Sequence, residues 1–322
     1  MSAPLPEAIK MVDLRVDYGD FAAVDSLSLT VPSGEVFGLV GPNGAGKTSS
    51  FKVLATLMEP TFGEVFLCGI DIALQPEKAR RVLGYMPDLA PVPSDLKCWE
   101  FLDLYAAAHG LDELEREQRI AECLEKVDLA DKRHAICSSL SRGMKQRLVL
   151  AKTLLHRPKV MLLDEPASGM DPFSRVALRR ILKELAAEGT TVIVSSHILS
   201  ELSDMCTSIG FMAAGKLIDA GTTEEVLARQ GKAERQIRVE LLDATGVAAC
   251  VEAIEGCGIE GVEATGRVVT FAMGGEGHEQ VAILRKLVEL GLPVRSFEEQ
   301  RTSIEDVLLG LDAEHHAGGG ED

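Results

Sequence analysis

The chain has 322 residues, of which 46% are hydrophobic, so it is long enough for one large and one small domain, each with its own core. Its 33 Lys and Arg stand against 50 Asp and Glu, a formal net charge of −17, and an acidic surface repels phosphate, so we expect no nucleic-acid partner. No apolar run approaches the roughly 18 residues of a membrane span, and the first ten residues lack the apolar centre of a signal peptide, so we expect a cytoplasmic chain.

The first predicted elements are strands. After a disordered tail over residues 1–8, apolar and polar residues alternate over residues 10–16 and 27–31, which is typical of half-buried strands. A continuous apolar run over residues 36–40 predicts a buried strand, and residues 51–54 begin a helical pattern.

Between this strand and this helix, residues 41–48 read Gly-Pro-Asn-Gly-Ala-Gly-Lys-Thr, the pattern G-x-x-x-x-G-K-T of a phosphate-binding loop. Glycines let the backbone wrap closely around phosphate oxygens, and the N–H groups at the start of the helix point at the anion. At this spacing Lys47 can reach the β- and γ-phosphates, and Thr48 can place its hydroxyl on Mg²⁺. A glycine-rich turn without a ligand is the alternative, but it leaves the lysine, the hydroxyl and the flanking elements unexplained. The predicted nucleotide-binding residues are Gly41, Pro42, Asn43, Gly44, Ala45, Gly46, Lys47, Thr48 and Ser49.

The middle of the chain changes from strand to helix patterns. A hairpin is predicted at residues 63–69, and three prolines within residues 87–93 mark a break. Apolar residues then recur at helical spacing, as at Trp99, Phe101, Leu102 and Tyr105. We expect a helical subdomain over about residues 89–158, inserted in an α/β core.

An apolar strand over residues 160–163 ends in Asp164 and Glu165. In a phosphate-binding-loop protein the aspartate at such a strand end lies near Mg²⁺, and the adjacent glutamate can act as a general base on an attacking water. The same pattern alone also fits a strand that runs into a solvated turn. The phosphate-binding loop upstream favours the catalytic interpretation.

The strand and helix signals then repeat. A helix is predicted over residues 173–187, and a second apolar strand over residues 191–194, as expected for a buried parallel sheet. A last hairpin is predicted over residues 215–221. The helix residues that we expect to pack on the sheet are Val176, Ile181, Leu182 and Leu185.

A separate α+β module is predicted over residues 222–311. After a helix at 224–229, strands and helices follow in the order strand-helix-strand-strand-helix-strand, which is the ferredoxin-like order. A final helix is predicted at residues 303–311 and a disordered tail at 312–322. The seven cysteines are dispersed and have no C-x-x-C spacing, so we expect reduced thiols.

Four further segments carry a resemblance to a known family. Residues 140–147, Leu-Ser-Arg-Gly-Met-Lys-Gln-Arg, resemble the Leu-Ser-Gly-Gly-Gln signature of ABC ATPases, with Ser141 as the N-cap of the following helix. Residues 167–171 resemble the family's D-loop, His197 its switch histidine, and Tyr18 the aromatic residue that stacks on adenine. A capped helix, a structural histidine and a half-buried strand tyrosine are the plainer alternatives. The order and number of the motifs favour the resemblance.

By this resemblance, residues 9–221 are identified as an ABC ATPase domain, similar to the nucleotide-binding subunits of ABC transporters. The unusual signature and residues 85–88, Tyr-Met-Pro-Asp, resemble the two-component exporter branch. The resemblance implies a P-loop NTPase (RecA-like) α/β core with an antiparallel β subdomain and a helical subdomain. It also implies the cofactors ATP and Mg²⁺, a second ATP-binding subunit arranged head to tail, and separate permease chains that hold the subunit at the cytoplasmic face of the membrane.

The resemblance also assigns roles to individual residues. Lys47, Glu165 and His197 are the expected catalytic residues, and Thr48, Asp88 and Asp164 the expected Mg²⁺ ligands. In a second subunit, Ser141, Gly143 and Met144 would close over the nucleotide and Asp171 would cross the interface. Two positions depart from the family: Asp88 replaces a glutamine, and Arg142 replaces the first glycine of the signature.

Three other functions fit parts of the sequence. A soluble ABC ATPase acting on ribosomes or DNA would share the motifs, although one cassette and a charge of −17 argue against it. A regulatory binding protein would give residues 222–311 the main role. A small-molecule kinase would use the phosphate-binding loop but leaves residues 140–144 and His197 unexplained.

Overall fold

The computed structural model describes the chain apart from residues 1–5, 231–234, 260, 274–276 and 301–322. The chain divides after Thr223 into two compact units. The predicted helix at residues 303–311 and the predicted tail at 312–322 lie outside the described residues.

The first unit begins with an antiparallel sheet in the order β2-β1-β4-β5. Its long strands alternate buried and exposed residues, as expected when only one face is covered. The tail predicted over residues 1–8 is too long, because Glu7 pairs with Pro32 and Ala8 is buried. The bounds are β1 Glu7–Tyr18, β2 Phe21–Pro32, β4 Phe62–Leu67 and β5 Ile70–Asp71.

The second sheet of this unit has six strands in the order β10-β9-β3-β8-β7-β6. All neighbours are parallel except β9 and β10. Every residue of β3, β7 and β8 is buried, which explains the apolar runs over residues 36–40, 160–163 and 192–194. The bounds are β3 Val36–Val40, β6 Leu83–Met86, β7 Val160–Asp164, β8 Thr191–Ser196, β9 Ser208–Ala213 and β10 Lys216–Thr222. A whole hairpin was predicted at residues 215–221, but these residues form only β10, the second strand of the antiparallel pair β9-β10.

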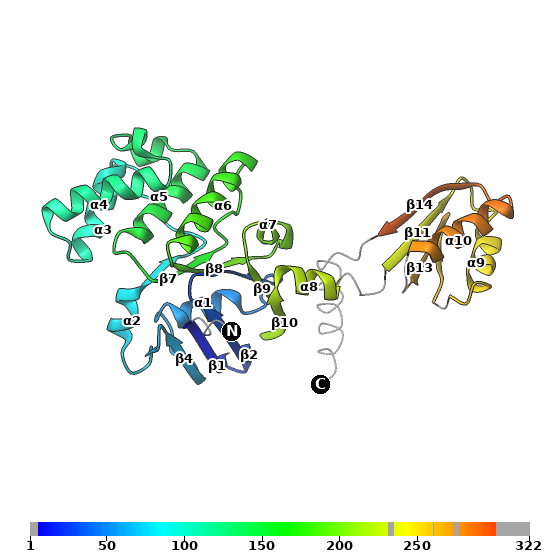
Figure 1. The fold of residues 1–322 in the computed structure, drawn as a ribbon, viewed down its shortest axis with the longest axis horizontal. Coiled ribbons are helices and arrows are strands. Elements are labelled where there is room, and N and C mark those ends of the chain that lie inside the picture. Colours follow the sequence, from blue (N-terminus) through cyan, green and yellow to red (C-terminus); the bar gives the residue numbers. More distant parts are fainter. Residues whose placement is uncertain (1–5, 231–234, 260, 274–276, 301–322) are drawn as a thin grey trace. The chain divides into compact units, whose positions relative to one another are not determined.

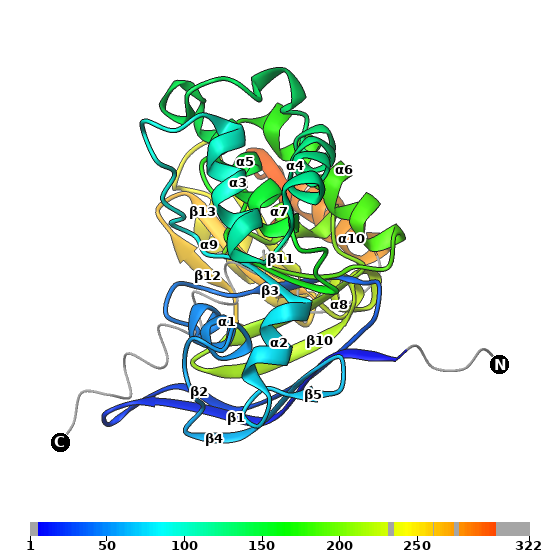
Figure 2. The ribbon, with the colours of Figure 1, turned by 90° about the vertical axis from the view of Figure 1, so that its left-hand side faces the viewer.

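The helices of the first unit contact its two sheets or one another (Figure 1). Helix α1 contacts both sheets, and one hydrophobic core joins them. Helices α6 and α7 contact β8 and β3, and α2 contacts β5 and β6. Helices α3, α4 and α5 pack against one another, and α5 also contacts β6 and α6 (Figure 2). The bounds are α1 Lys47–Leu54, α2 Pro76–Val82, α3 Cys98–Ala108, α4 Glu113–Lys126, α5 Arg142–Leu154, α6 Pro172–Ala187 and α7 Leu199–Ser203. Helix α8, Thr223–Gln230, begins at the division and belongs to the second unit from Glu224 on.

The second unit contains a four-stranded antiparallel sheet in the order β12-β13-β11-β14, with helices α9 and α10. Its core consists of the apolar residues of β11 and β13 and the inner faces of the two helices. The chain order β11-α9-β12-β13-α10-β14 confirms the predicted ferredoxin-like order. The bounds are β11 Arg235–Leu241, α9 Val247–Glu255, β12 Glu263–Thr265, β13 Val268–Met273, α10 Gly277–Glu289 and β14 Val294–Gln300.

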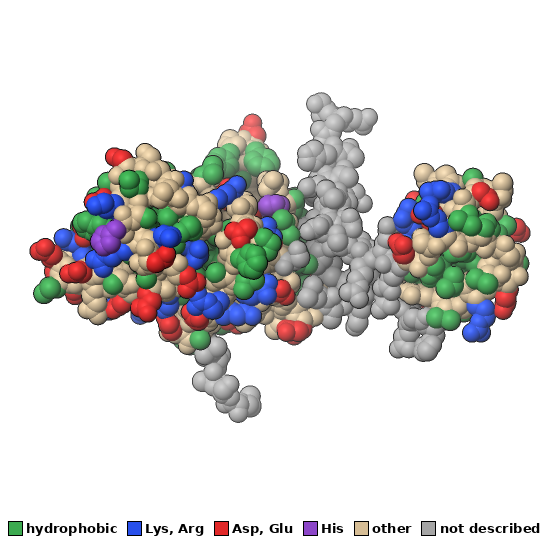
Figure 3. Space-filling model, turned by 90° about the horizontal axis from the view of Figure 1, so that it is seen from above, with side chains coloured by type: hydrophobic (Ala, Val, Ile, Leu, Met, Phe, Trp, Pro, Cys, Tyr) green, Lys and Arg blue, Asp and Glu red, His purple; other side chains and the backbone are tan. Residues whose placement is uncertain are grey.

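Within the described ranges, no helix has both the length and the apolar character that a bilayer crossing requires. Acidic and basic side chains are interspersed over the face of the first unit that Figure 3 shows. A surface of mixed sign keeps like charges apart, although the chain as a whole is acidic.

The inner face of α6 differs from the sequence prediction at one position. Val176 is 62% exposed, whereas Leu178, which we did not single out, is 1% exposed. Ile181, Leu182 and Leu185 are buried as predicted. The helix begins at Pro172 after the N-cap Asp171, and its rotation about its axis turns Val176 away from the sheet.

This difference predicts the stability of two matched variants. Leu178→Ala removes a buried side chain and leaves a cavity, so it should lower the free energy of unfolding by about 2–5 kcal/mol. Val176→Ala should change it by less than about 0.5 kcal/mol. Scanning calorimetry of the full chain measures both; equal effects would contradict the burial of Leu178.

Candidate active site

The phosphate-binding loop joins β3 to α1 and lies against two other strands. A Cβ atom added at Gly41 would lie 2.1 Å from the Met212 carbonyl oxygen. One added at Gly46, whose φ is +99°, would lie 2.3 Å from the Ala23 carbonyl oxygen. Only glycine fits at these two positions, so the loop conformation depends on them.

The loop presents unpaired N–H groups at the start of α1. Among the described residues, the backbone N–H groups of Gly44, Gly46, Lys47 and Thr48 have no hydrogen-bond acceptor. Unpaired N–H groups at a helix N-terminus, together with the helix dipole, stabilise an anion placed there. The loop therefore fits the phosphate chain of a nucleotide.

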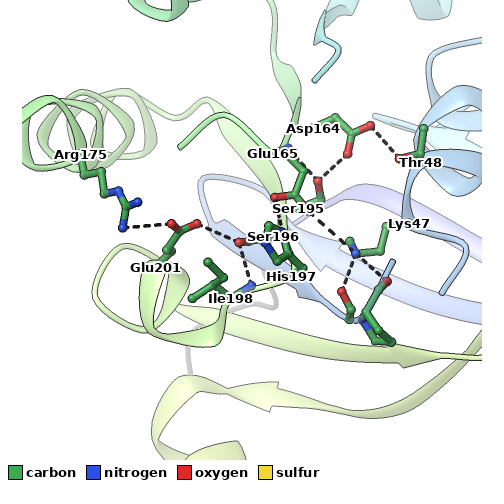
Figure 4. A network of polar contacts seen from close by, with 12 residues as sticks. Lys47, Thr48, Asp164, Glu165, Arg175, Ser195, Ser196, His197, Ile198 and Glu201 are labelled. Carbon is green, nitrogen blue, oxygen red and sulfur yellow. Dashed lines mark hydrogen bonds and ion pairs between the residues drawn. The ribbon is translucent and has the colours of Figure 1, made fainter. Parts of the chain in front are cut away.

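Lys47 is a buried cation, with 6% of its surface exposed. Its Nζ donates to the carbonyl oxygens of Gly41 and Pro42, the latter at 3.0 Å, and lies 3.9 Å from Oε1 of Glu165 (Figure 4). Burial lowers the pKa of Lys47, and the negative charges of Glu165 and Asp164 oppose that shift. The ammonium is thus held where it can approach a phosphate oxygen.

Asp164 ends β7 beside the end of β8, where its register partner is Ser195. Its Oδ2 accepts a hydrogen bond from Thr48 Oγ1 at 2.9 Å, and its Oδ1 accepts one from Ser195 Oγ at 2.6 Å (Figure 4). The structure thus brings together a hydroxyl and a carboxylate, oxygen ligands of the kind that Mg²⁺ takes. Within the described ranges no three His, Cys, Asp or Glu side chains are grouped to hold a metal alone, so an ion here would need phosphate and water oxygens as well.

Asp88, the third expected Mg²⁺ ligand, is exposed after the end of β6, and within the described residues the hydrogen bonds of Thr48 and Asp164 do not include it. It lines an open cleft of about 690 Å³ with residues of the following loop and of α5, among them Arg142, Lys145 and Gln146. Its metal role therefore stays a prediction.

Glu165 follows β7 in the left-handed region, with a φ of +48°, which non-glycine residues rarely adopt. The N–H of Glu165 donates a hydrogen bond to the Ser195 hydroxyl at 3.0 Å, which stabilises this conformation. Burial raises the pKa of Glu165, and the hydrogen bond with His197 Nδ1, 3.0 Å from Oε2, opposes that rise. A partly buried carboxylate with a raised pKa suits a general base.

A second hydrogen-bond network fixes the segment that carries His197, and the sequence analysis missed it. Ser196 Oγ donates to Glu201 Oε2 and accepts from the N–H of Ile198, both at 3.0 Å. Glu201 also pairs with Arg175 Nη1 at 3.1 Å (Figure 4). The sequence signal for this network was the pair Ser195 and Ser196 at the end of a buried strand, where hydroxyl groups need hydrogen-bond partners.

The signature segment packs against the start of α6 in the same chain. Ser141 accepts a hydrogen bond from the Met144 N–H at 3.3 Å, which confirms it as the N-cap of α5. A Cβ at Gly143 would lie 2.4 Å from Ser174 Oγ, and Ser174 in turn donates to both carboxylate oxygens of Asp171. These bonds lower the pKa of Asp171.

Two other expected features also lie near these motifs. The Arg142 guanidinium covers Gly169, where an added Cβ would lie 2.3 Å from Cζ. Tyr18 ends β1, is 47% exposed, and its hydroxyl lies 3.5 Å from Ser49 Oγ on α1. The tyrosine ring is therefore beside the phosphate-binding loop and open to solvent on one side.

Comparison with known proteins identifies the family. Residues 24–168 match the family described as ABC transporter. The chain is 35% identical to the probable multidrug ABC transporter ATP-binding protein YbhF of Escherichia coli over 72% of its own length, but that match spans only 40% of YbhF. It is 32% identical to the daunorubicin resistance ATP-binding protein DrrA3 of Streptomyces coeruleorubidus, over 91% of this chain and 92% of the relative.

A solved structure has the same fold. A bacterial ABC transporter cassette described as dimeric superposes with a TM-score of 0.61 at 25% identity, over 67% of this chain and 98% of that one. This agreement confirms the predicted P-loop NTPase fold. Together with the nearly full-length match to DrrA3, it shows that the chain belongs to the ATP-binding proteins of the ABC transporter family.

Proposed function

We propose that this chain binds ATP with Mg²⁺ and hydrolyses it to drive export through separate membrane permease chains. The observation that carries the proposal is the meeting of Lys47, Thr48, Asp164 and Glu165, which come from two distant parts of the sequence, at one edge of the parallel sheet. An anion site, two oxygen ligands and a general base lie together there.

Different residues of the site would act on the phosphate chain, the metal ion and the attacking water. The loop N–H groups and Lys47 bind the phosphate chain and offset its charge. Thr48 and Asp164 would hold Mg²⁺, which when bound supplies further positive charge at the phosphate oxygens. Glu165 accepts a proton from the attacking water, and His197 holds the carboxylate in place through its Nδ1 contact.

A complete site needs a second copy or a sibling chain. Ser141 bonds to Met144 of α5, and the atoms nearest Gly143 belong to Ser174 of α6 and to Asp171 in the same chain. A head-to-tail partner would bring Ser141, Gly143 and Met144 over the nucleotide and place Asp171 at the interface. The dimeric state of a similar cassette supports this arrangement. Tyr18 would stack on the adenine.

Export is supported by the names of the relatives, which are multidrug and daunorubicin-resistance ATP-binding proteins. In this proposal the chain attaches to the cytoplasmic face of the membrane through its permease, which contacts residues 87–93 and the helical subdomain. Purification of the chain from detergent-solubilised membranes of its native cells should recover a polytopic permease. Recovery of ribosomes or DNA-repair proteins instead would favour the alternative of a non-transport ABC ATPase.

Glu165→Gln tests the general base. The amide keeps the size of the side chain but cannot accept the proton, so steady-state hydrolysis should fall about 10²–10⁴-fold while ATP binding remains. Phosphate release and nucleotide titration measure the two properties. Near-normal hydrolysis in this variant would remove Glu165 from the role.

Lys47→Ala tests the phosphate-binding cation. Loss of a charge-assisted contact at a buried site should weaken ATP binding on the order of 100-fold by calorimetry. Lys52→Ala, on the last turn of the same helix, is the matched control and should bind ATP as the unaltered chain does. Equal affinity of the Lys47 variant and this control would contradict the assignment.

His197→Ala tests the link between the switch histidine and the base. The His197 hydrogen bond lowers the pKa of Glu165, so its loss should raise that pKa further. Because the base acts in its ionised form, the acid limb of the kcat–pH profile should move to higher pH, in addition to any loss of rate. His134→Ala should leave the limb unmoved; a limb that stays in place or moves down in the His197 variant would argue against the coupling.

A further inference from the structure

The imidazole of His197 depends on its backbone for its position. His197 follows β8 with 44% of its side chain exposed, and its Nδ1 lies 3.0 Å from Oε2 of Glu165. A side chain with this exposure changes rotamer easily, because few neighbours restrain it. The contact with Glu165 therefore requires that other bonds fix the turn that carries His197.

Ser196 supplies those bonds. Its carbonyl oxygen accepts from the N–H of Gly41 at 3.3 Å, and its hydroxyl accepts from the N–H of Ile198 at 3.0 Å. The same hydroxyl donates to Oε2 of Glu201 at 3.0 Å (Figure 4). A hydroxyl has one hydrogen to donate, so the bond to Glu201 directs its lone pairs toward Ile198. The turn around His197 is therefore fixed while Glu201 stays in place.

Glu201 is a buried carboxylate that is paired with a cation. The residue is 8% exposed, so water does little to stabilise its charge. Nη1 of Arg175 lies 3.1 Å from Oε1 and supplies the opposite charge, while Oε2 is left for Ser196. Without Arg175 the buried charge would lose this compensation, which favours a rotamer that turns toward solvent and releases Ser196.

Arg175 connects this carboxylate to a different part of the fold. It lies on the first turn of α6, where its N–H donates to the carbonyl oxygen of Asp171 at 3.1 Å. Its guanidinium reaches from there to Glu201 on α7 (Figure 4). A continuous series of polar contacts thus runs from α6 through Glu201 and Ser196 to the turn of His197.

We propose that Arg175 and Glu201 are positioning residues for His197 and, through it, for the base Glu165. While the ion pair is intact, Ser196 holds the turn and the imidazole stays against the carboxylate of Glu165. When the pair is broken, the turn loosens and the base loses its partner. The proposal rests on the proposed ATP hydrolysis, but the position of the imidazole is measurable without nucleotide.

Arg175→Met removes the charge and keeps the length of the side chain. It should lower kcat about 10–100-fold, as expected when a catalytic group is displaced by about 1 Å. The affinity for ATP should change less than about twofold, because the phosphate-binding loop is untouched. Arg175→Lys should restore most of the rate, since an ammonium can replace the single Nη1 contact.

Glu201→Gln tests the other side of the pair. An amide has one oxygen acceptor instead of two, so it can serve Arg175 or Ser196 but not both. Hydrolysis should fall as in Arg175→Met, again with ATP affinity kept. The two substitutions together should be slower than the slower single variant by less than about twofold, since both act through the same turn.

Arg179→Met is the matched control. Arg179 lies one turn further along α6, and its Nη2 pairs with Oδ2 of Asp204 at 2.6 Å, directly after α7. This pair joins the same two segments but includes neither Glu201 nor Ser196. The control should hydrolyse ATP as the unaltered chain does, and circular dichroism establishes that each variant is folded.

Nuclear magnetic resonance of the full chain without nucleotide reports the imidazole directly. The Cε1–H signal of His197 is identified by its absence in His197→Ala. It should shift in Arg175→Met and in Glu201→Gln and stay in place in Arg179→Met. If these shifts occur but the unaltered chain does not hydrolyse ATP, the positioning of His197 is supported and the proposed function fails.

Four results would overturn the proposal. An unmoved His197 signal in Arg175→Met, or hydrolysis in that variant equal to Arg179→Met, would show that the pair does not position the imidazole. A loss of ATP affinity as large as the loss of kcat would mean that the pair acts on binding or folding. Hydrolysis by Arg175→Lys as slow as by Arg175→Met would remove the ion pair as the cause.

Discussion

The active site depends on the burial of one cation. Lys47 lies almost entirely out of solvent, and a buried ammonium without partners would destabilise the fold by several kcal/mol. Two carbonyl oxygens of its own loop accept its hydrogen bonds, and the carboxylates of Asp164 and Glu165 offset its charge. Since Asp164 ends β7 and Glu165 follows it, the parallel order β3-β8-β7 is required for the loop to keep its lysine in place.

Strand β8 lies between β3, which leads into the loop of Lys47, and β7, which ends in Asp164. Its last two residues are serines. The Ser195 hydroxyl donates to Asp164 and accepts from the N–H of Glu165, and the Ser196 hydroxyl donates to Glu201. A side chain that both donates and accepts can fix a carboxylate and a backbone N–H at once. The strand end thereby holds Glu165 in a conformation that it would rarely adopt alone, which directs its carboxylate toward His197 and Lys47.

The signature segment shows how one residue can meet two requirements. Gly143 must lack a side chain within its own chain, because Ser174 occupies the space beside it. Packing against α6 therefore explains the glycine without any ligand. The proposed contact with a partner's nucleotide would be made by the same residue. Arg142 adds a contact that the usual glycine would lack, since it covers Gly169 of the D-loop segment. Residues 140–147 and 167–171, which resemble the signature and the D-loop, thus pack against each other in this chain.

The sequence alone determined the features that depend on near neighbours. The strand-loop-helix around Lys47 was predicted because glycine spacing and helix start are local, Ser141 was predicted as a cap for the same reason, and the ferredoxin-like order followed from alternating and helical patterns. Only the tertiary structure decided which side of α6 faces the sheet, that Glu7 and Ala8 join a strand, and that Ser195 and Glu201 support the site. Those features depend on strand register and helix rotation, which are set by packing between segments that lie far apart in the chain.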